Sequence, residues 1–152
     1  MINSVVYVAV GLIVLTTVRI VFGCDFADKY VISNQRVTFH DAYVRCRQHG
    51  FDPVEILSEH DEKEIEAVLK NETNYGWQNA FWIFATNLGD KKNYYWLDSG
   101  KPLFYSKFAA GQPSNVEQEN CLEIWKTSSE IFEWNDAPCD TKLRFICKYR
   151  QL

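Results

Sequence analysis

Cysteine is the residue type whose number and spacing most clearly indicate chemistry in this sequence. The five cysteines are Cys24, Cys46, Cys121, Cys139 and Cys147. Structural zinc sites use closely spaced Cys-x-x-Cys ligands, and this spacing is absent. Disulfide bonds are therefore the expected use of these thiols, and four cysteines allow three different pairings. Because the count is odd, one sulfur has no partner within the chain.

The sequence carries no motif that is typical of an enzyme active site. It lacks Gly-x-Ser-x-Gly, His-Glu-x-x-His and a glycine-rich phosphate loop. The histidines His40, His49 and His60 fall on or beside predicted helices without a nucleophile nearby. We interpret them as structural surface residues, and the sequence therefore favours a binding protein over an enzyme.

The first 23 residues are expected to be a signal peptide. Residues 5–18 form an uncharged apolar run, which is long enough for a signal-peptide core but shorter than the ~20 residues that span a bilayer. Cleavage after Gly23 fits the pattern. The alternative is a signal anchor, but residues 1–4 lack the positive charge expected on its cytoplasmic side. We therefore expect a secreted protein with no membrane span after cleavage, where disulfides are permitted.

Residues 24–152 have a length that suits a single domain with its own core. The full chain is 47% hydrophobic and carries a formal net charge of −4. The apolar content excludes a disordered chain. The acidic balance argues against nucleic acid as a partner, because nucleic-acid binders present a basic surface to phosphates.

The chain predicts two helices first and β-strands afterwards. Thr38 and Ser58 are each followed three residues later by aspartate, which is typical of a helix N-terminus. Apolar residues then recur at helical spacing, and Gly50 is expected to end the first helix. In the second helix, the charged run 59–66 is interpreted as the solvated face.

The second half of the chain predicts an antiparallel sheet and one long loop. Residues 80–85 are a dense apolar run that fits a strand buried on both faces. Further short β-prone segments are residues 94–96, 122–125, 131–134 and 143–147. Residues 98–119 contain Gly and Pro with little periodicity, which predicts a functional loop. The predicted fold class is α+β.

Motifs in these strands resemble those of the animal C-type lectin domain. They are Trp82-Ile83-Phe84-Ala85, Glu119-Asn120-Cys121-Leu122-Glu123 and Trp134-Asn135-Asp136, followed by Cys139 and Cys147. The resemblance covers residues 30–149 and is greatest to the short, secreted single-domain lectins of insects. It implies a double-looped fold whose long loop carries the ligand site. It also implies two nested disulfides, Cys46–Cys147 and Cys121–Cys139.

The resemblance implies a site that binds Ca²⁺ and carbohydrate together. In sugar-binding members, Ca²⁺ is held by residues on both sides of a cis proline, by a glutamate and by an Asn-Asp pair. The residues at these positions are Gln112 and Ser114 around Pro113, Glu119, Asn135 and Asp136. Their oxygens suit Ca²⁺, and sugar hydroxyls can complete its coordination. Taken alone, residues 134–136 also fit a tight turn.

Two positions beside Pro113 bear on the class of sugar and on the affinity for Ca²⁺, and Ser114 departs from the family pattern. Gln112 resembles the galactose-type triplet more than the mannose-type triplet, so galactose-type glycans are favoured. Ser114 replaces an acidic or amide residue and leaves two carboxylates in the site, which is expected to weaken Ca²⁺ binding. A second family calcium position falls on Asn87, Lys91, Asn115 and Asn120. A lysine with three amides is expected to hold a dication poorly.

Some expectations concern alternatives and modifications. The alternative function is a calcium-independent domain of the same fold that binds a protein or another surface, which Ser114 favours. Asn71-Glu72-Thr73 fits the N-glycosylation rule at a position expected to be exposed.

Cys24 is the cysteine outside the lectin frame. A dimer linked through Cys24 is favoured over a capped thiol or its removal by a later cleavage.

Overall fold

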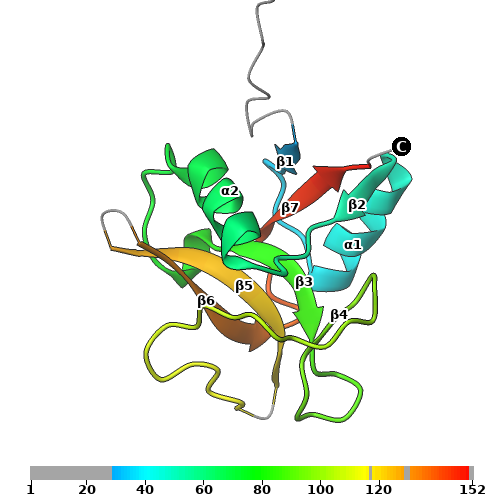
Figure 1. Ribbon diagram of the computed structural model, residues 1–152, viewed down its shortest axis with the longest axis vertical. Helices are drawn as coiled ribbons and strands as arrows, with labels where there is room; N and C mark the ends of the chain where they lie inside the picture. Colours follow the sequence, from blue (N-terminus) through cyan, green and yellow to red (C-terminus); the bar gives the residue numbers. More distant parts are fainter. Residues whose placement is uncertain (1–28, 117, 129–130, 151–152) are drawn as a thin grey trace, which may run out of the picture.

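The computed structural model describes residues 29–150 except 117, 129 and 130, and Figure 1 labels its elements. The helical elements are α1 (Phe39–Gln48), α2 (Glu59–Leu69) and the short 3-10 helix η2 (Trp77–Asn79). The strands are β1 (Tyr30–Ile32), β2 (Phe51–Pro53), β3 (Phe81–Thr86), β4 (Tyr95–Trp96), β5 (Glu119–Ser128), β6 (Ile131–Pro138) and β7 (Arg144–Tyr149). The predicted α+β class is confirmed. The predicted signal peptide and Cys24 lie outside the described residues.

Both helices begin at the residues that their capping patterns predict. The hydroxyls of Thr38 and Ser58 accept hydrogen bonds from the backbone N–H groups of Asp41 and Asp61. Beyond the end of α1, Gly50 has a φ of 78°, a left-handed conformation that glycine adopts without steric cost. The chain therefore turns directly from α1 into β2.

The charged run of α2 is only partly solvated, contrary to the prediction. Glu62 and Glu64 are 2% and 5% exposed. Glu64 accepts hydrogen bonds from the Lys29 ammonium and the Tyr30 hydroxyl, while Glu62 accepts from the indole N–H of Trp134. Each carboxylate can be buried because another element supplies it with a donor.

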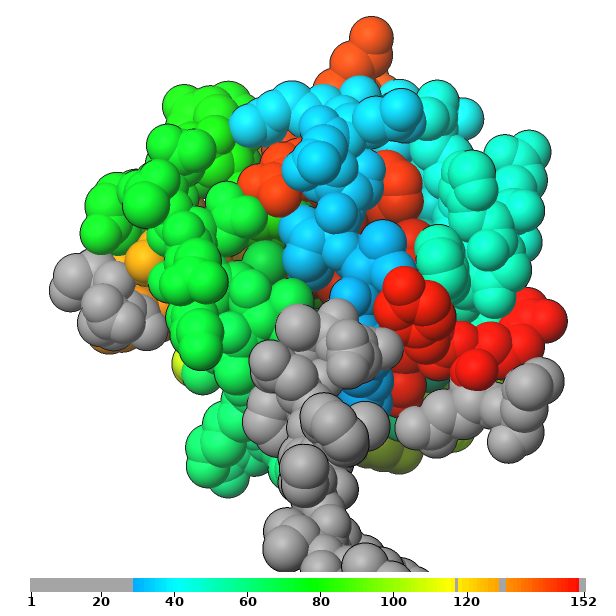
Figure 2. All heavy atoms as spheres, turned by 90° about the horizontal axis from the view of Figure 1, so that it is seen from above, coloured from blue at the N-terminus to red at the C-terminus, as the bar shows by residue number. Residues whose placement is uncertain are grey.

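A seven-stranded sheet forms the centre of the fold. The strand order is β1-β7-β3-β5-β6, with β2 also pairing β7 and β4 pairing β3. The pairs are antiparallel except β3 with β7, which run parallel. In Figure 1, α2 and α1 lie to either side of β7, and β5 and β6 cross the lower half. Figure 2 shows the first described residues lying between α1 and the region that follows α2.

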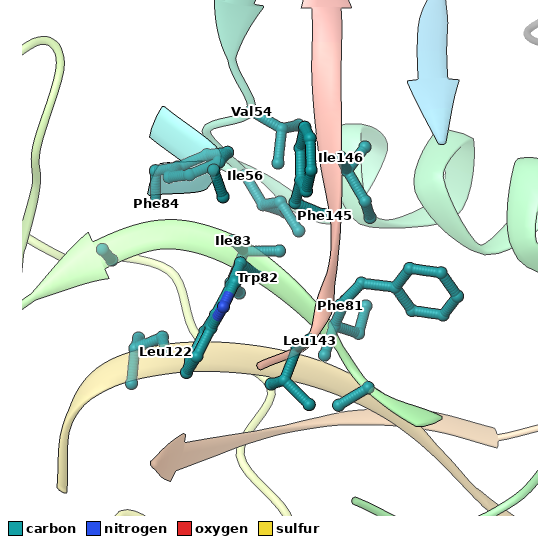
Figure 3. Packing of buried hydrophobic residues seen from close by; sticks show 14 of the residues in the cluster. Val54, Ile56, Phe81, Trp82, Ile83, Phe84, Leu122, Leu143, Phe145 and Ile146 are labelled. Carbon is teal, nitrogen blue, oxygen red and sulfur yellow. The ribbon is translucent and has the colours of Figure 1, made fainter. Parts of the chain in front are cut away.

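The core is built around β3, which is buried along its whole length as predicted. Figure 3 shows Phe84 lying toward Val54 and Ile56, while Trp82 lies toward Leu122 of β5. These side chains are at most 2% exposed. Because β3 contacts elements on both faces, it fixes the position of β5, on which part of the candidate site is built.

Two disulfides join the parts of the fold in the nested arrangement that the resemblance implied. Cys46–Cys147 ties α1 to β7, and Cys121–Cys139 ties the start of β5 to the segment after β6. Their sequence separations are 101 and 18 residues. The first bond therefore closes most of the domain, and the second closes the β5–β6 unit.

The long loop between β4 and β5 is held against β6 by backbone hydrogen bonds. The N–H of Trp134 donates to the carbonyl of Lys107, and the N–H of Ala109 donates to the carbonyl of Trp134. In Figure 1 this loop lies at the lower side of the molecule. It thereby brings the segment that follows Ala109 close to the residues after Trp134.

The predicted exposure of the three histidines and of Asn71 is confirmed. Among the tryptophans, Trp82, Trp96 and Trp134 are at most 1% exposed. Within residues 29–150, apart from the gaps given above, no helix combines the length and apolar character required to span a membrane.

Candidate functional site

Four of the five predicted site residues line one depression of about 450 Å³. They are Gln112, Ser114, Glu119 and Asn135. The peptide bond between Gln112 and Pro113 is cis, as the resemblance implied. The apolar residues Trp77, Val116 and Trp125 complete the lining. The depression therefore combines oxygen-bearing side chains with an aromatic surface.

Asp136, the fifth predicted residue, is fully buried and holds the loop in place. Its two carboxylate oxygens accept hydrogen bonds from the backbone N–H groups of Ser114 and Asn115, both at 2.8 Å. The Tyr94 hydroxyl lies 3.3 Å from the same carboxylate. Burial and then the charge of Asp136 raise the pKa of Tyr94, which keeps this hydroxyl protonated as a donor. Asp136 thus fixes the segment after Pro113 to β6.

Ser114 and Glu119 contact each other across the turn that leads into β5. The Ser114 hydroxyl donates to the Glu119 carboxylate and accepts from the backbone N–H of Val116. A serine at this position therefore supplies Glu119 with a neutral partner. An aspartate there would instead place a second negative charge beside Glu119.

Glu123 is a buried carboxylate to which the sequence assigned no role. It lies directly opposite Asn135 in the β5–β6 pairing, and the Asn135 amide N–H donates to it at 3.0 Å. Burial raises the pKa of Glu123 to about 8, Asn135 opposes this rise, and the charges of Glu119 and Asp136 add to it. The contact between Glu123 and Asn135 becomes visible only from the register of the β5–β6 pairing, because the two residues lie on different strands.

Three buried acceptor oxygens in this region have no hydrogen-bond partner among the described residues. They are Gln112 Oε1, Glu123 Oε2 and Asn135 Oδ1. A buried acceptor without a partner costs about 1–3 kcal/mol. Hard cations such as Ca²⁺ bind amide and carboxylate oxygens, so this donor set fits such an ion. Within the described residues, no group of three acidic, His or Cys side chains is placed to hold a metal, so amide and hydroxyl oxygens would have to contribute.

Trp77 and Trp125 give the depression an aromatic surface that the sequence did not predict. Trp125 of β5 is half-buried and lines the depression. Trp77 is 54% exposed and was not singled out. The local sequence around Trp77 did not indicate that it lines the site, because its proximity to β5 arises from tertiary structure.

A second depression, of about 300 Å³, lies beside the first. It contains all four residues of the second family calcium position, together with Val116 and Glu119. The Asn87 amide oxygen is buried there with no partner in the described part of the chain, but Lys91 contributes an ammonium group. The positive charge of Lys91 opposes a dication at this position.

Glu62 connects helix α2 to the strand that carries Asn135 and Asp136. Both of its carboxylate oxygens accept from the indole N–H of Trp134, at 3.3 and 3.0 Å. Burial raises the pKa of Glu62 to about 7, while Lys107 lowers it, Glu66 raises it and Trp134 lowers it. This carboxyl group therefore titrates near neutral pH.

Stability is expected to fall as pH rises from about 4.5 to about 7, because the raised pKa of Glu62 makes the folded state bind more protons than the unfolded chain in this window. With about 1.4 kcal/mol per pKa unit, the loss approaches ~3 kcal/mol. Glu62→Gln keeps an acceptor for Trp134 and removes the Glu62 titration, so it should make this dependence shallower and leave the part that the raised pKa of Glu123 contributes. Denaturant unfolding at several pH values measures it. Glu59→Gln, at an exposed position of α2, is the control, and a Glu62→Gln slope equal to that of the wild type would contradict the prediction.

Comparisons with known proteins agree on one kind of domain. Residues 35–149 match the family described as the lectin C-type domain. The chain is 28% identical over 132 residues to Salivary C-type lectin 2 of Aedes albopictus, covering 84% of this chain and 87% of that protein. It superposes on the mouse scavenger receptor C-type lectin carbohydrate-recognition domain with a TM-score of 0.67 and 28% identity, covering 82% and 92% of the two chains. Human lithostathine shares the fold, with a TM-score of 0.69, 23% identity and coverage of 80% and 91%.

Proposed function

The chain belongs to the C-type lectin domain family, and from this premise we propose that it is a secreted carbohydrate-binding protein whose binding depends on Ca²⁺. One observation carries the proposal. Gln112 and Asn135 each bury an acceptor oxygen that has no partner among the described residues, and both residues line the depression. A bound cation would supply the missing partner to these oxygens.

Five residues of this chain would hold the ion: Gln112, Ser114, Glu119, Asn135 and Asp136. Asn135 donates its N–H to Glu123, so its oxygen stays available as a ligand. Each Asp136 oxygen accepts one backbone N–H, and a carboxylate has about four acceptor positions in total. Asp136 can therefore fasten the loop and still contribute charge to the site.

The glycan would bind through hydroxyl groups that reach both the ion and its ligands. A hydroxyl donates to a carboxylate and accepts from an amide, so Glu119 and Gln112 can satisfy both of its hydrogen-bonding roles. Gln112 before the cis proline favours galactose-type over mannose-type glycans. The similar mouse receptor domain is described as a carbohydrate-recognition domain, which supports this class of ligand.

A glycan array with Ca²⁺, repeated with chelator, tests the function, and Ser114→Asp tests the site. The wild type should bind glycans only with Ca²⁺. The variant should bind Ca²⁺ about tenfold more tightly in calorimetry, because an added carboxylate raises the ligand charge of the site. Ser106→Asp is the matched control, because it adds the same charge at an exposed position outside the lining.

Two results would contradict this function. Glycan binding that survives the chelator would favour the calcium-independent alternative. A flat Ca²⁺ titration for both the wild type and Ser114→Asp would show that the site does not bind Ca²⁺. If Ser106→Asp raised the affinity equally, the gain would reflect net charge rather than a ligand at position 114.

The proposal includes secretion and processing. Residues 1–23 act as the signal peptide, and 24–152 form the secreted single domain. The similar Aedes albopictus protein is described as salivary, which supports an extracellular setting. The exposed Asn71 is proposed as a glycosylation site, and Cys24 as the link of a disulfide-bonded dimer.

A further inference from the structure

Trp77 is a large apolar side chain that the fold leaves uncovered beside the candidate site. It is 54% exposed, although burial of an indole is strongly favourable. It lines the same depression as Trp125 and the oxygen-bearing residues. An aromatic surface in this position is available to a ligand that also reaches those oxygens.

The segment that carries Trp77 is anchored to β5 on its N-terminal side. The N–H of Gly76 donates to the carbonyl of Lys126 at 3.2 Å. The ammonium group of Lys126, which is 7% exposed, donates to the carbonyl of Glu72 at 2.8 Å and lies 5.4 Å from the ring centre of Tyr75. A buried lysine thus holds this part of the chain in place.

The segment is also held on its C-terminal side. The guanidinium of Arg36 donates to the carbonyl of Gln78 and, at 2.9 Å, to the side chain of Asn79. The Asn79 amide closes the turn by donating to the carbonyl of Tyr75 at 2.9 Å. Trp77 is therefore an exposed residue on a fixed backbone, which lowers the entropic cost of binding a ligand.

The β5–β6 register places the aromatic residues further along the strands than the polar ones. Glu123 pairs with Asn135, and Trp125 pairs with Glu133. Trp125 lies on the same face as Glu123, roughly 7 Å further along the strand at about 3.3 Å per residue. This displacement is on the scale of one pyranose ring. The volume of about 450 Å³ falls within the about 300–1,000 Å³ of ligand pockets.

We propose, on the basis of the function proposed above, that Trp77 and Trp125 form a subsite for the second sugar ring of a glycan whose first ring binds the ion and its ligands. A pyranose presents C–H groups on its ring faces and hydroxyls at its edges. The indoles contact the C–H face, while the hydroxyls stay in water. The ligand class is therefore an oligosaccharide of at least two rings rather than a free monosaccharide.

Calorimetry in the presence of Ca²⁺ tests the subsite. The probes are methyl β-galactoside with lactose, and methyl α-mannoside with mannobiose. In the series that binds, the wild type should bind the disaccharide more tightly than the monosaccharide. Trp77→Ala should remove about tenfold of the disaccharide affinity and leave the monosaccharide affinity unchanged. Phe104→Ala is the control, because Phe104 is 92% exposed outside the depression.

Each other outcome overturns the subsite in a recognisable way. Monosaccharide binding with equal disaccharide affinities in the wild type and Trp77→Ala would overturn it while the proposed function stands. If Trp77→Ala lost the same factor of affinity for the monosaccharide and the disaccharide, Trp77 would belong to the first subsite instead. Sedimentation showing wild-type dimers that Trp77→Ala abolishes, without a change in sugar affinity, would make the indole a contact between two copies. Failure of every probe with Ca²⁺ would overturn the function and the subsite together.

Discussion

Asp136→Asn is expected to destabilise the domain and to abolish the proposed Ca²⁺ binding at the same time. The wild-type carboxylate is fully buried and accepts backbone N–H groups of Ser114 and Asn115 on its two oxygens. Asparagine has one acceptor oxygen and one NH₂ group, so at least one N–H would face another donor. The buried, unsatisfied group costs about 1–3 kcal/mol, or roughly 4 °C in Tm for each kcal/mol.

The loss of Ca²⁺ binding has two causes in this variant. A negative charge is removed from a site that already has a serine at position 114, and the segment that carries Gln112 and Ser114 is no longer fastened to β6. Thermal unfolding with and without Ca²⁺, together with a calcium titration, measures both effects.

Tyr94→Phe is the matched control for Asp136→Asn. It removes only the 3.3 Å hydroxyl contact to the same carboxylate, so it should lower Tm less and retain Ca²⁺ binding. An Asp136→Asn protein with wild-type Tm and wild-type calcium affinity would show that this carboxylate neither fastens the loop nor holds the ion.

Removing the Cys46–Cys147 bond is expected to cause the largest loss of stability among the changes considered. In the chain-entropy account, a bond that closes about 100 residues contributes ~4.7 kcal/mol, and its sequence separation is 101. Both cysteines are at most 2% exposed, so alanine at both positions avoids introducing an unsatisfied polar group. Guanidinium unfolding of Cys46→Ala/Cys147→Ala measures the loss.

Cys121→Ala/Cys139→Ala provides the comparison, because its sequence separation is only 18 residues. The entropic account expects the longer loop to matter more, by about 1.5 kcal/mol. Equal losses in the two double variants would show that local packing around the sulfurs, rather than loop length, determines their contribution. A wild-type unfolding midpoint for the Cys46–Cys147 variant would contradict the prediction outright.

The helices and the central strand could be predicted because their signals are local. Thr38 and Ser58 each cap a helix through an N–H only three residues away, and the apolar run of β3 needs no partner to be recognised. The burial of Glu62 could not be predicted, because its donor, Trp134, lies 72 residues away in sequence. A charged residue in a helix has the same pattern whether it faces water or a distant indole.

In the candidate site too, the features with a local sequence signal could be predicted, and those created by tertiary contacts could not. Its motif residues are recognisable in sequence, and four of them share one depression. The partner of Asn135 was missed because Glu123 becomes its neighbour only through cross-strand pairing. The exposed indole of Trp77 was missed because Lys126 and Gly76 bring its segment to β5 by tertiary contacts.

The pairing of β1 with β7 places the first and last strands of the described chain side by side. In Figure 1, both lie in the upper half, whereas the long β4–β5 loop occupies the lower side. Attachment through either end of the domain would therefore leave the depression facing outward. Copies joined in this way keep every site accessible, and their avidity for a glycan-covered surface would depend on the length and stiffness of the connection.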